Sequence, residues 1–478
     1  MPRSRSTSRQ CREQSRFNLK QRVAQSGTLA VLPMQFVGDS QQVSRMPATP
    51  TSRDTRIDSL DVLRGVAILG ILLMNIIDFG LPEAYDNPTN YGGATGADLW
   101  SWITNTMLFE GTWRGLFTLL FGAGVVLFTR RLERAQVPEA ADLHVRRMLW
   151  LIVFGIVNSH LLLWLGDILW EYGVVGLMLY AFRKTAVRTL LVLAAAILIA
   201  ISVRGVVDVL QLQSQRSAAD TALAVQAAGG TLSKAQQDAA DTWSHSLEDL
   251  KPSEDRLREE IAGMRGGWPA VFKTVTDHTF YLRTSYFYRY SFAEDFATML
   301  LGIALFAVGA LQGQWTLRRY ALLTGVGYGL GLLVNTLETT AVMRSGFDVI
   351  TLQWTLSASY ELGRIPMTLG HLGLVMLTCK SGVFPATLRR LASVGRMALT
   401  NYLTQSLLCT LIFSGVGFGL YAQLSRHQLY YVVGAIWVVQ LIWSPLWLAR
   451  FQYGPAEWAW RSLTYGRLQG LRRSAVSL

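Results

Sequence analysis

Ten apolar runs alternate with polar segments along most of the chain, and each approaches the length of a helix that crosses a bilayer. A transmembrane helix needs about 20 mostly apolar residues to cross the ~30 Å hydrocarbon core. The runs predict helices at residues 62–79, 113–129, 148–165, 168–182, 189–210, 291–311, 320–342, 365–379, 397–423 and 429–448. The predicted fold is therefore an all-α, polytopic integral membrane bundle of about ten transmembrane helices.

Positive charge divides the connections between these runs into two classes. Arginine and lysine concentrate after the second, fourth, sixth and eighth runs and in the C-terminal tail. Segment 80–111 contains four acidic residues and no lysine or arginine. Because short cytoplasmic loops of membrane proteins are enriched in lysine and arginine, the basic segments and both termini are predicted to be cytoplasmic. Segment 80–111 is predicted to be external.

Composition divides the chain into five parts. Residues 1–55 are rich in Arg, Ser and Gln without sustained periodicity, which predicts a disordered basic extension. Residues 211–290 have mixed and nearly balanced charges and predict one external, soluble helical insert. The insert separates two membrane bundles of five spans each, at residues 56–210 and 291–450, and residues 451–478 form a basic cytoplasmic tail.

The amino-acid composition and the mean hydropathy exclude an ordinary soluble enzyme. The chain is 51% hydrophobic and 16% charged, with a mean hydropathy of +0.27. Its net charge of +12 comes from clusters between apolar runs, and no nucleic-acid-binding motif accompanies them, so no nucleic acid partner is expected. Cys11, Cys379 and Cys409 have no paired spacing typical of a disulfide framework or metal site.

Two local patterns make structural predictions. The consecutive small residues Gly122, Ala123 and Gly124 favour close approach of another helix over a phosphate-binding loop, which needs a preceding strand and a lysine. Pro455, followed by Glu457, is typical of the first turn of a short helix after the last span.

Polar and ionisable side chains within the runs are functional candidates, because they are costly in hydrocarbon. Those expected to contact substrate are Asp61, Arg64, Asn75, Arg114, Glu171, Arg364 and Asn401. An ordinary first span would equally explain Asp61 and Arg64, with Asp58 or Ser59 as its cap, acidic residues at the positive end of its dipole and Arg64 as an anchor. Asn401 and Gln405 lie one turn apart, which also fits hydrogen bonding between helices.

Two histidines are candidates for proton transfer, since imidazole titrates near neutral pH. His160 precedes Asp167 by seven residues, and the two would share a helical face if the helix continued that far. Such a pair would be a base and its orienting acid. His371 lies among small residues, which suits packing or a cavity wall. Hydrogen bonding to a neighbouring helix is an equal alternative, and neither context is that of a metal site, so no metal is predicted.

Three motifs resemble a known family. RIDSLDVLRGVAILGILLMN at 56–75, GRMALTNYLTQS at 395–406 and YGPAEWAWR at 453–461 resemble motifs of the YeiB-like bacterial membrane proteins, which carry domain of unknown function 418. That family is in turn similar to the transmembrane acyltransferase superfamily, which includes the lysosomal heparan-glucosaminide acetyltransferase. The resemblance implies a multi-pass protein of the bacterial inner membrane, and the short heads of the family imply a translation start at Met46.

The resemblance also implies a reaction. The related acetyltransferases are expected to pass an acyl group from a cytoplasmic thioester such as acyl-CoA to an acceptor across the membrane, using a histidine after the first span. This chain has Tyr85 and Asp86 there but no histidine, so His160 would have to substitute. A transporter or exporter with charged residues along its path is the alternative, and a membrane scaffold is a third. Expected partners are the lipid bilayer, a small-molecule or envelope-glycan substrate and, as an option, a second copy of the chain.

Overall fold

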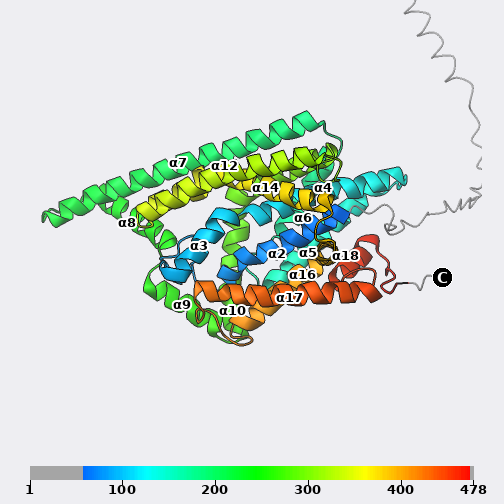
Figure 1. The fold of residues 1–478 in the computed structure, drawn as a ribbon. Helices are drawn as coiled ribbons and strands as arrows, with labels where there is room; N and C mark the ends of the chain where they lie inside the picture. The colour runs from blue at the N-terminus through cyan, green and yellow to red at the C-terminus, as the bar shows by residue number, and fades with distance from the viewer. Residues whose placement is uncertain (1–57, 474–478) are drawn as a thin grey trace, which may run out of the picture. The chain divides into compact units, whose positions relative to one another are not determined.

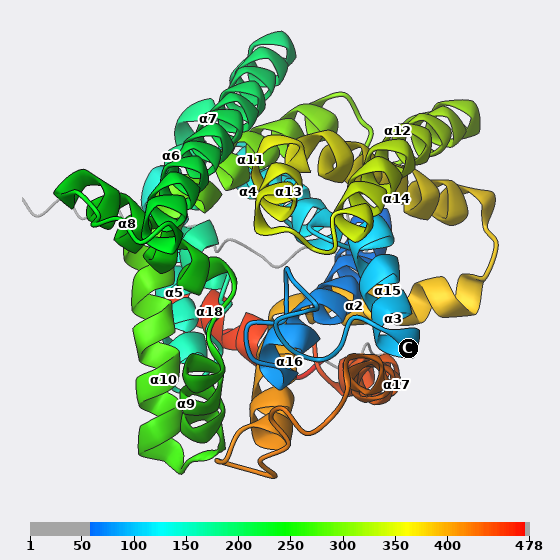
Figure 2. The same ribbon diagram turned by 90° about the vertical axis from the view of Figure 1, so that its left-hand side faces the viewer.

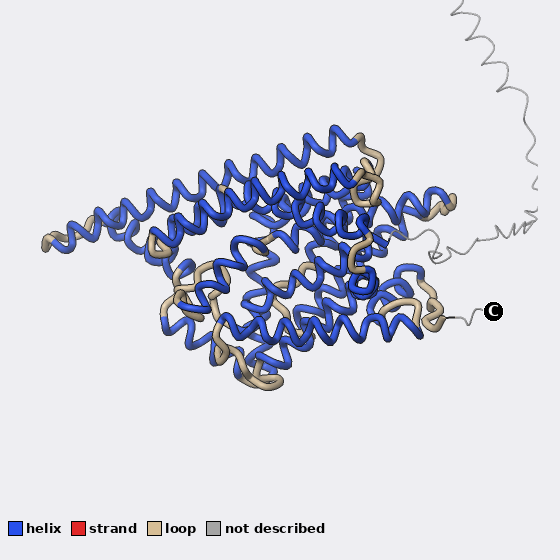
Figure 3. Tube along the Cα trace, viewed as in Figure 1, coloured by secondary structure: helices blue, strands red, loops and turns tan. Residues whose placement is uncertain are grey.

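The computed structural model describes residues 58–473, and the predicted extension with its Met46 start lies outside them. The described chain is helical (Figures 1 and 3). Its helices are α2 (Asp58–Gly80), α3 (Gly96–Leu108), α4 (Thr112–Arg134), α5 (Ala140–His160), α6 (Leu169–Phe182), α7 (Val187–Ala227), α8 (Lys234–Leu250), α9 (Glu254–Arg265), α10 (Trp268–Tyr281), the π-helix η2 (Leu282–Ser291), α11 (Phe292–Ala307), α12 (Leu317–Arg344), α13 (Val349–Gln353), the π-helix η3 (Trp354–Ala358), α14 (Tyr360–Ser381), α15 (Pro385–Arg396), α16 (Ala398–Phe413), α17 (Arg426–Arg450) and α18 (Pro455–Tyr465).

The predicted membrane bundle is confirmed. Within residues 58–473, seven helical segments are long and apolar enough to cross a membrane. Each of the ten predicted segments overlaps a helix, at α2, α4, α5, α6, α7, α11, α12, α14, α16 and α17, although the ninth was predicted to reach residue 423 and α16 ends at Phe413. Helices α6 and α16 are apolar but shorter than a typical span. The number of spans and the side of each terminus stay predictions.

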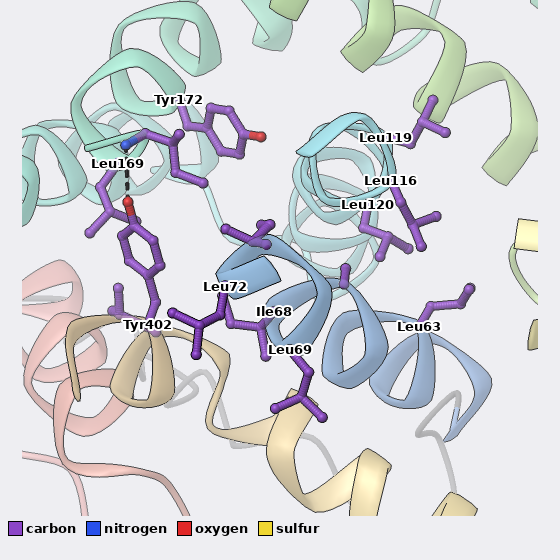
Figure 4. Close-up of a cluster of buried hydrophobic side chains, with 14 of the residues drawn as sticks. Leu63, Ile68, Leu69, Leu72, Leu116, Leu119, Leu120, Leu169, Tyr172 and Tyr402 are labelled. Carbon is purple, nitrogen blue, oxygen red and sulfur yellow. Dashed lines mark hydrogen bonds between the residues drawn. The ribbon is translucent and has the colours of Figure 1, made fainter. Parts of the chain in front are cut away.

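Helix α2 is the centre of the bundle and α7 lies at its edge. Of the 18 residues that form the apolar stretch of each helix, 78% are buried in α2 and 17% are buried in α7. The side chains of α2 pack against leucines of α4 and belong to one buried apolar cluster with Leu169, Tyr172 and Tyr402 of α6 and α16 (Figure 4). Large apolar side chains are exposed on α7 and on α12, which stand apart from each other at the outside of the bundle (Figure 2). These two helices therefore present the surface that a bilayer would cover.

The fifth predicted span and the external insert share one helix. Helix α7 continues without a break across residue 210, where the sequence changes from apolar to polar, and ends at Ala227. Trp243 and Leu247 of α8 then pack against a small cluster formed by Val209, Val349 and Ile350. The insert is thus continuous with the bundle in secondary structure, and its first helices fold back onto it.

The predicted hydrogen bonds between helices and the predicted short helix after the last span are both confirmed. Asn401 Nδ2 donates to Ser444 Oγ at 3.1 Å, and Gln405 Nε2 donates to Gln440 Oε1 at 3.0 Å, so both link α16 to α17. Pro455 opens α18, as predicted. The Glu457 carboxylate accepts hydrogen bonds from the first backbone N–H groups of α16, 2.7 Å from the nitrogen of Leu399, and so caps that helix.

The predicted close packing at Gly122 is also confirmed, and its partner is Gly302 of α11. A Cβ on Gly122 would lie 2.2 Å from the carbonyl oxygen of Met299, and one on Gly302 would lie 2.0 Å from that of Leu119. Backbone atoms cannot rotate away as a side chain can, so the missing Cβ atoms are what allow α4 and α11 to touch.

We expect Gly302→Ala to lower the free energy of unfolding by about 1–3 kcal/mol, because the added methyl group overpacks this contact. Reversible unfolding in mixed detergent micelles measures the change. The matched control is Gly325→Ala in α12, where an added Cβ meets no atom within 4 Å. Equal stabilities of the two variants would show that α4 and α11 do not touch at Gly302.

Candidate functional site

An acidic cavity of about 180 Å³ opens at one end of the bundle. At this end of the bundle α2 and α5 end and α4 begins, and residues of α8, α9, α10 and α13 line the cavity. Figure 1 shows α8 and α9 at this end. We call it the acidic end. The ionisable residues lining the cavity, apart from Tyr85, are Asp78, Glu83, Asp86, Asp249, Glu260 and His278. The site therefore combines five carboxylates with one imidazole, an arrangement that attracts cations, amines and hydroxyl groups.

A second, smaller cavity of about 40 Å³ shares Tyr85 and Asp86 with the first. Glu110 lies in its wall, in the turn between α3 and α4, and accepts hydrogen bonds from Tyr85 Oη at 3.1 Å and Tyr360 Oη at 3.5 Å. The next residue, Gly111, has φ of +64°, and a Cβ there would overlap the Tyr360 hydroxyl. Glycine at this position thus allows Tyr360 to reach Glu110.

Asp86 is the carboxylate common to both cavities. Desolvation by the surrounding protein and the nearby charge of Glu83 raise the pKa of Asp86 to about 6, although its side chain reaches solvent, and Arg426 opposes the shift. A carboxylate with a pKa near neutrality both accepts and releases protons readily at physiological pH.

Next to these cavities lies a buried arginine–carboxylate network, formed by Arg114, Glu294, Asp295, Glu361 and Arg364. Arg114 contacts Glu294 at 2.7 Å and Asp295 at 4.0 Å. Arg364 contacts Glu361 at 2.6 Å and Glu294 at 3.3 Å. The network joins α4, α11 and α14, and Asp295 Oδ2 has no hydrogen-bond partner among residues 58–473. Three of these ion contacts link different helices at the acidic end, and the fourth, between Arg364 and Glu361, lies within α14.

The structure brings together three of the predicted substrate-contacting residues. Arg114 and Arg364 belong to the network, and Glu171 lies within electrostatic reach of Asp295 and Arg114. The other four lie apart from it. Asn75 is partly buried in α2, Asn401 links α16 to α17, and Asp61 pairs with Arg64 at 3.2 Å near the start of α2.

The predicted pair of His160 and Asp167 is not in hydrogen-bond contact in the described chain. Helix α5 ends at His160, whose Nδ1 lies 2.9 Å from Ser159 Oγ. Asp167 instead accepts from Asn158 Nδ2 at 2.8 Å and lies 3.7 Å from Arg283. The catalytic roles of the two residues stay predictions.

Both ring nitrogens of His371 are in hydrogen-bond contact. Nδ1 lies 2.7 Å from Tyr328 Oη, and Nε2 lies 2.9 Å from the carbonyl oxygen of Leu108. The ring stacks on Trp113 with centroids 4.3 Å apart. These contacts fit the alternative of a histidine bonded to neighbouring helices, and the catalytic role of His371 also stays a prediction.

The opposite end of the bundle is basic. Here α2 and α5 begin, α4 ends and α18 packs against α5. The Arg147 guanidinium lies over the rings of Phe128, at 4.8 Å, and Trp460, at 3.8 Å. The charges of Arg64 and Arg461 act on it. We call Arg64, Arg146, Arg147 and Arg461 the basic cluster.

The ionisable residues that line the acidic cavity were not among the site residues predicted from the sequence. Tyr85 and Asp86, like Glu110 of the smaller cavity, lie in a segment with four acidic residues and no lysine or arginine, a signal that was available. Glu260 and His278 carry no such signal, because they are isolated residues in a polar insert. Only the fold of α9 and α10 brings them to the loop after α2.

Comparison with known proteins identifies relatives over nearly the whole chain. The family model described as "Protein of unknown function (DUF418)" matches residues 305–467. "Uncharacterized protein YeiB" of Escherichia coli (strain K12) is 31% identical over 426 residues, which cover 85% of this chain and 95% of the relative. "Uncharacterized protein YxaH" of Bacillus subtilis (strain 168) is 29% identical over 87% of this chain and 96% of its own length. No solved structure matches the chain.

Proposed function

The chain belongs to the YeiB-like DUF418 family of membrane proteins, and from this premise we propose that it is an inner-membrane, acyltransferase-like enzyme whose acceptor binds in the acidic cavity. One observation carries the proposal. The ends of the central helix α2 lie at two chemically opposite sites, with Arg64 of the basic cluster near its start and Asp78 of the acidic cavity near its end. A phosphate-bearing donor and a hydroxyl- or amine-bearing acceptor would each find complementary charge.

Asp86 is the proposed proton acceptor, because it borders both cavities. In this proposal the donor's phosphates stay at the basic cluster while its thioester arm extends along the bundle to the acidic cavity. There the acceptor's oxygen or nitrogen attacks the thioester carbonyl carbon, and a C–O or C–N bond forms as the C–S bond breaks. The acceptor's proton passes to the Asp86 carboxylate and from there to the departing thiolate. The thiol therefore leaves neutral and Asp86 returns to its ionised form.

The basic cluster suits the phosphates of a donor such as acyl-CoA. Arg147 is held by two aromatic rings, and Trp460 Nε1 donates to its carbonyl oxygen at 2.9 Å, so the guanidinium is positioned in advance. Guanidinium groups bind phosphate by paired hydrogen bonds. Arg146 forms an exposed pair with Asp142 at 2.8 Å, a weak interaction that phosphate would readily replace.

The test is transfer of label by the full-length chain reconstituted in lipid vesicles. Radiolabelled acetyl and longer acyl thioesters are supplied with hydroxyl- and amine-bearing envelope acceptors. We expect label on an acceptor only when the protein is present. No transfer with any donor or acceptor would reject the enzyme.

The buried network favours a second candidate, a transporter. Its three acids, with Glu171 nearby, outnumber the two arginines, which is the balance expected of a site that takes up a proton or a cation. The same vesicles distinguish the two functions, because a transporter moves solute across the membrane without forming a labelled product.

A further inference from the structure

We propose that Glu83, Glu260 and His278 bind one divalent metal ion in the acidic cavity. One ligand atom from each side chain lies within 4.8 Å of the other two. The three residues come from the loop after α2, from α9 and from α10, so the fold alone assembles them. The proposal goes beyond acyl transfer and does not depend on it.

Each side chain retains an atom able to bind a metal. His278 Nδ1 lies 2.9 Å from the carbonyl oxygen of Thr274. A carbonyl only accepts hydrogen bonds, so Nδ1 carries the proton and Nε2 keeps its lone pair. This arrangement, in which the second nitrogen donates to a backbone carbonyl, is the usual support for a histidine that binds a metal.

The carboxylates are supported in a similar way. Arg256 Nη2 contacts Glu83 Oε1 at 3.1 Å, and Tyr421 Oη donates to Glu260 Oε1. These contacts orient both side chains and leave Oε2 of each available. Arg256 also contacts Asp249 at 3.3 Å, so its single charge is shared between two carboxylates. A divalent ion would balance the charge that remains among the five carboxylates of the cavity.

Asn87 provides an independent indication of a ligand. Its side chain lines the same cavity and is 3% exposed. Oδ1 accepts a hydrogen bond from the backbone nitrogen of Thr89 at 2.9 Å, whereas Nδ2 has no partner in the part of the chain that the structure describes. A buried donor of this kind normally meets water or a ligand acceptor. A water molecule or an acceptor oxygen bound to the ion would accept the hydrogen bond from Asn87 Nδ2.

The ligand set favours Mn²⁺ or Zn²⁺ over Ca²⁺, which binds oxygen atoms alone. Metal–ligand distances of about 2.1 Å place the ligand atoms about 3.4 Å apart in a tetrahedral site. The spacing of up to 4.8 Å would therefore have to shorten by side-chain rotation, and all three side chains are partly exposed. Three protein ligands leave a position open toward the cavity, as in catalytic rather than structural metal sites.

Metal titration of the full-length chain tests the site. The protein is purified through a tag without histidine, stripped with EDTA and titrated with Mn²⁺ and, separately, with Zn²⁺. We expect one ion per chain, and a Kd at least about 10-fold higher for Glu260→Gln and for His278→Ala. Glu259→Gln and His245→Ala are matched controls, because both residues are exposed in the same insert. Their Kd should equal that of the unchanged protein.

Electron spin echo modulation from bound Mn²⁺ gives a second readout. Nitrogen modulation is expected in the unchanged protein and in the His245→Ala control, and not in His278→Ala. Thermal unfolding in EDTA establishes that each variant folds, and Glu83→Gln replaces any variant that does not. The proposal is overturned if no ion binds, if the controls weaken binding as much as the ligand variants, or if nitrogen modulation is absent.

Discussion

Replacing Arg364 with methionine is expected to lower the free energy of unfolding by about 3–5 kcal/mol. Arg364 is 2% exposed and contacts Glu361 at 2.6 Å and Glu294 at 3.3 Å. Removing the guanidinium leaves the Glu361 carboxylate buried without its cation, and desolvation of that charge is the main cost. Reversible unfolding in mixed detergent micelles measures the difference.

A double variant separates the orphaned charge from the loss of side-chain packing. Arg364→Met combined with Glu361→Met removes both charges, and Glu294 keeps Arg114 at 2.7 Å. We expect the double variant to recover most of the lost stability, since apolar replacements of a buried pair are often neutral. Arg344→Met, at the exposed end of α12, is the control and should change stability by no more than about 0.5 kcal/mol. A single variant as stable as this control would contradict the buried network.

Asp86→Asn is expected to lower the rate of acyl transfer by about 10²- to 10⁴-fold, the usual contribution of a positioned proton acceptor. The amide keeps the shape of the side chain but cannot accept the acceptor's proton. The effect should therefore fall on kcat more than on KM, in the vesicle assay with radiolabelled thioester.

Asp255→Asn is the matched control for that change. This variant makes the same chemical change, carboxylate to amide, on an exposed face of α9, where Asp255 pairs with Arg258. We expect wild-type kcat from this control. A folded Asp86→Asn protein with unchanged kcat would remove Asp86 from the proposed reaction.

The helices were predictable because each apolar run is a local signal. The residues at which the helices end were harder to predict. The polar residues after 210 mark the end of the apolar surface, but they are compatible with a helix, and α7 therefore continues until just before Gly229, which has φ of +77°. The shared face of His160 and Asp167 depended on the same kind of boundary. It required the helix to continue to residue 167, and α5 ends at His160.

The site was predictable only in part. The cost of charge in hydrocarbon was enough to select Arg114 and Arg364. Their shared contact, Glu294, is 180 positions from Arg114, and no local pattern pairs residues at that distance. The same holds for His278, which reaches Glu83 only because α10 packs beside α9.

Chemical labelling of single cysteines tests the central claim, that the acidic cavity and the basic cluster lie on opposite sides of the membrane. The three native cysteines are first replaced by serine. Glu259→Cys, beside the acidic cavity, and Gln136→Cys, between α4 and α5, then each place one exposed thiol at one end of the bundle. In intact spheroplasts, an impermeant maleimide should label the cysteine at 259 and should label the one at 136 only after the membrane is permeabilised. Labelling of both thiols from the same side would contradict the account.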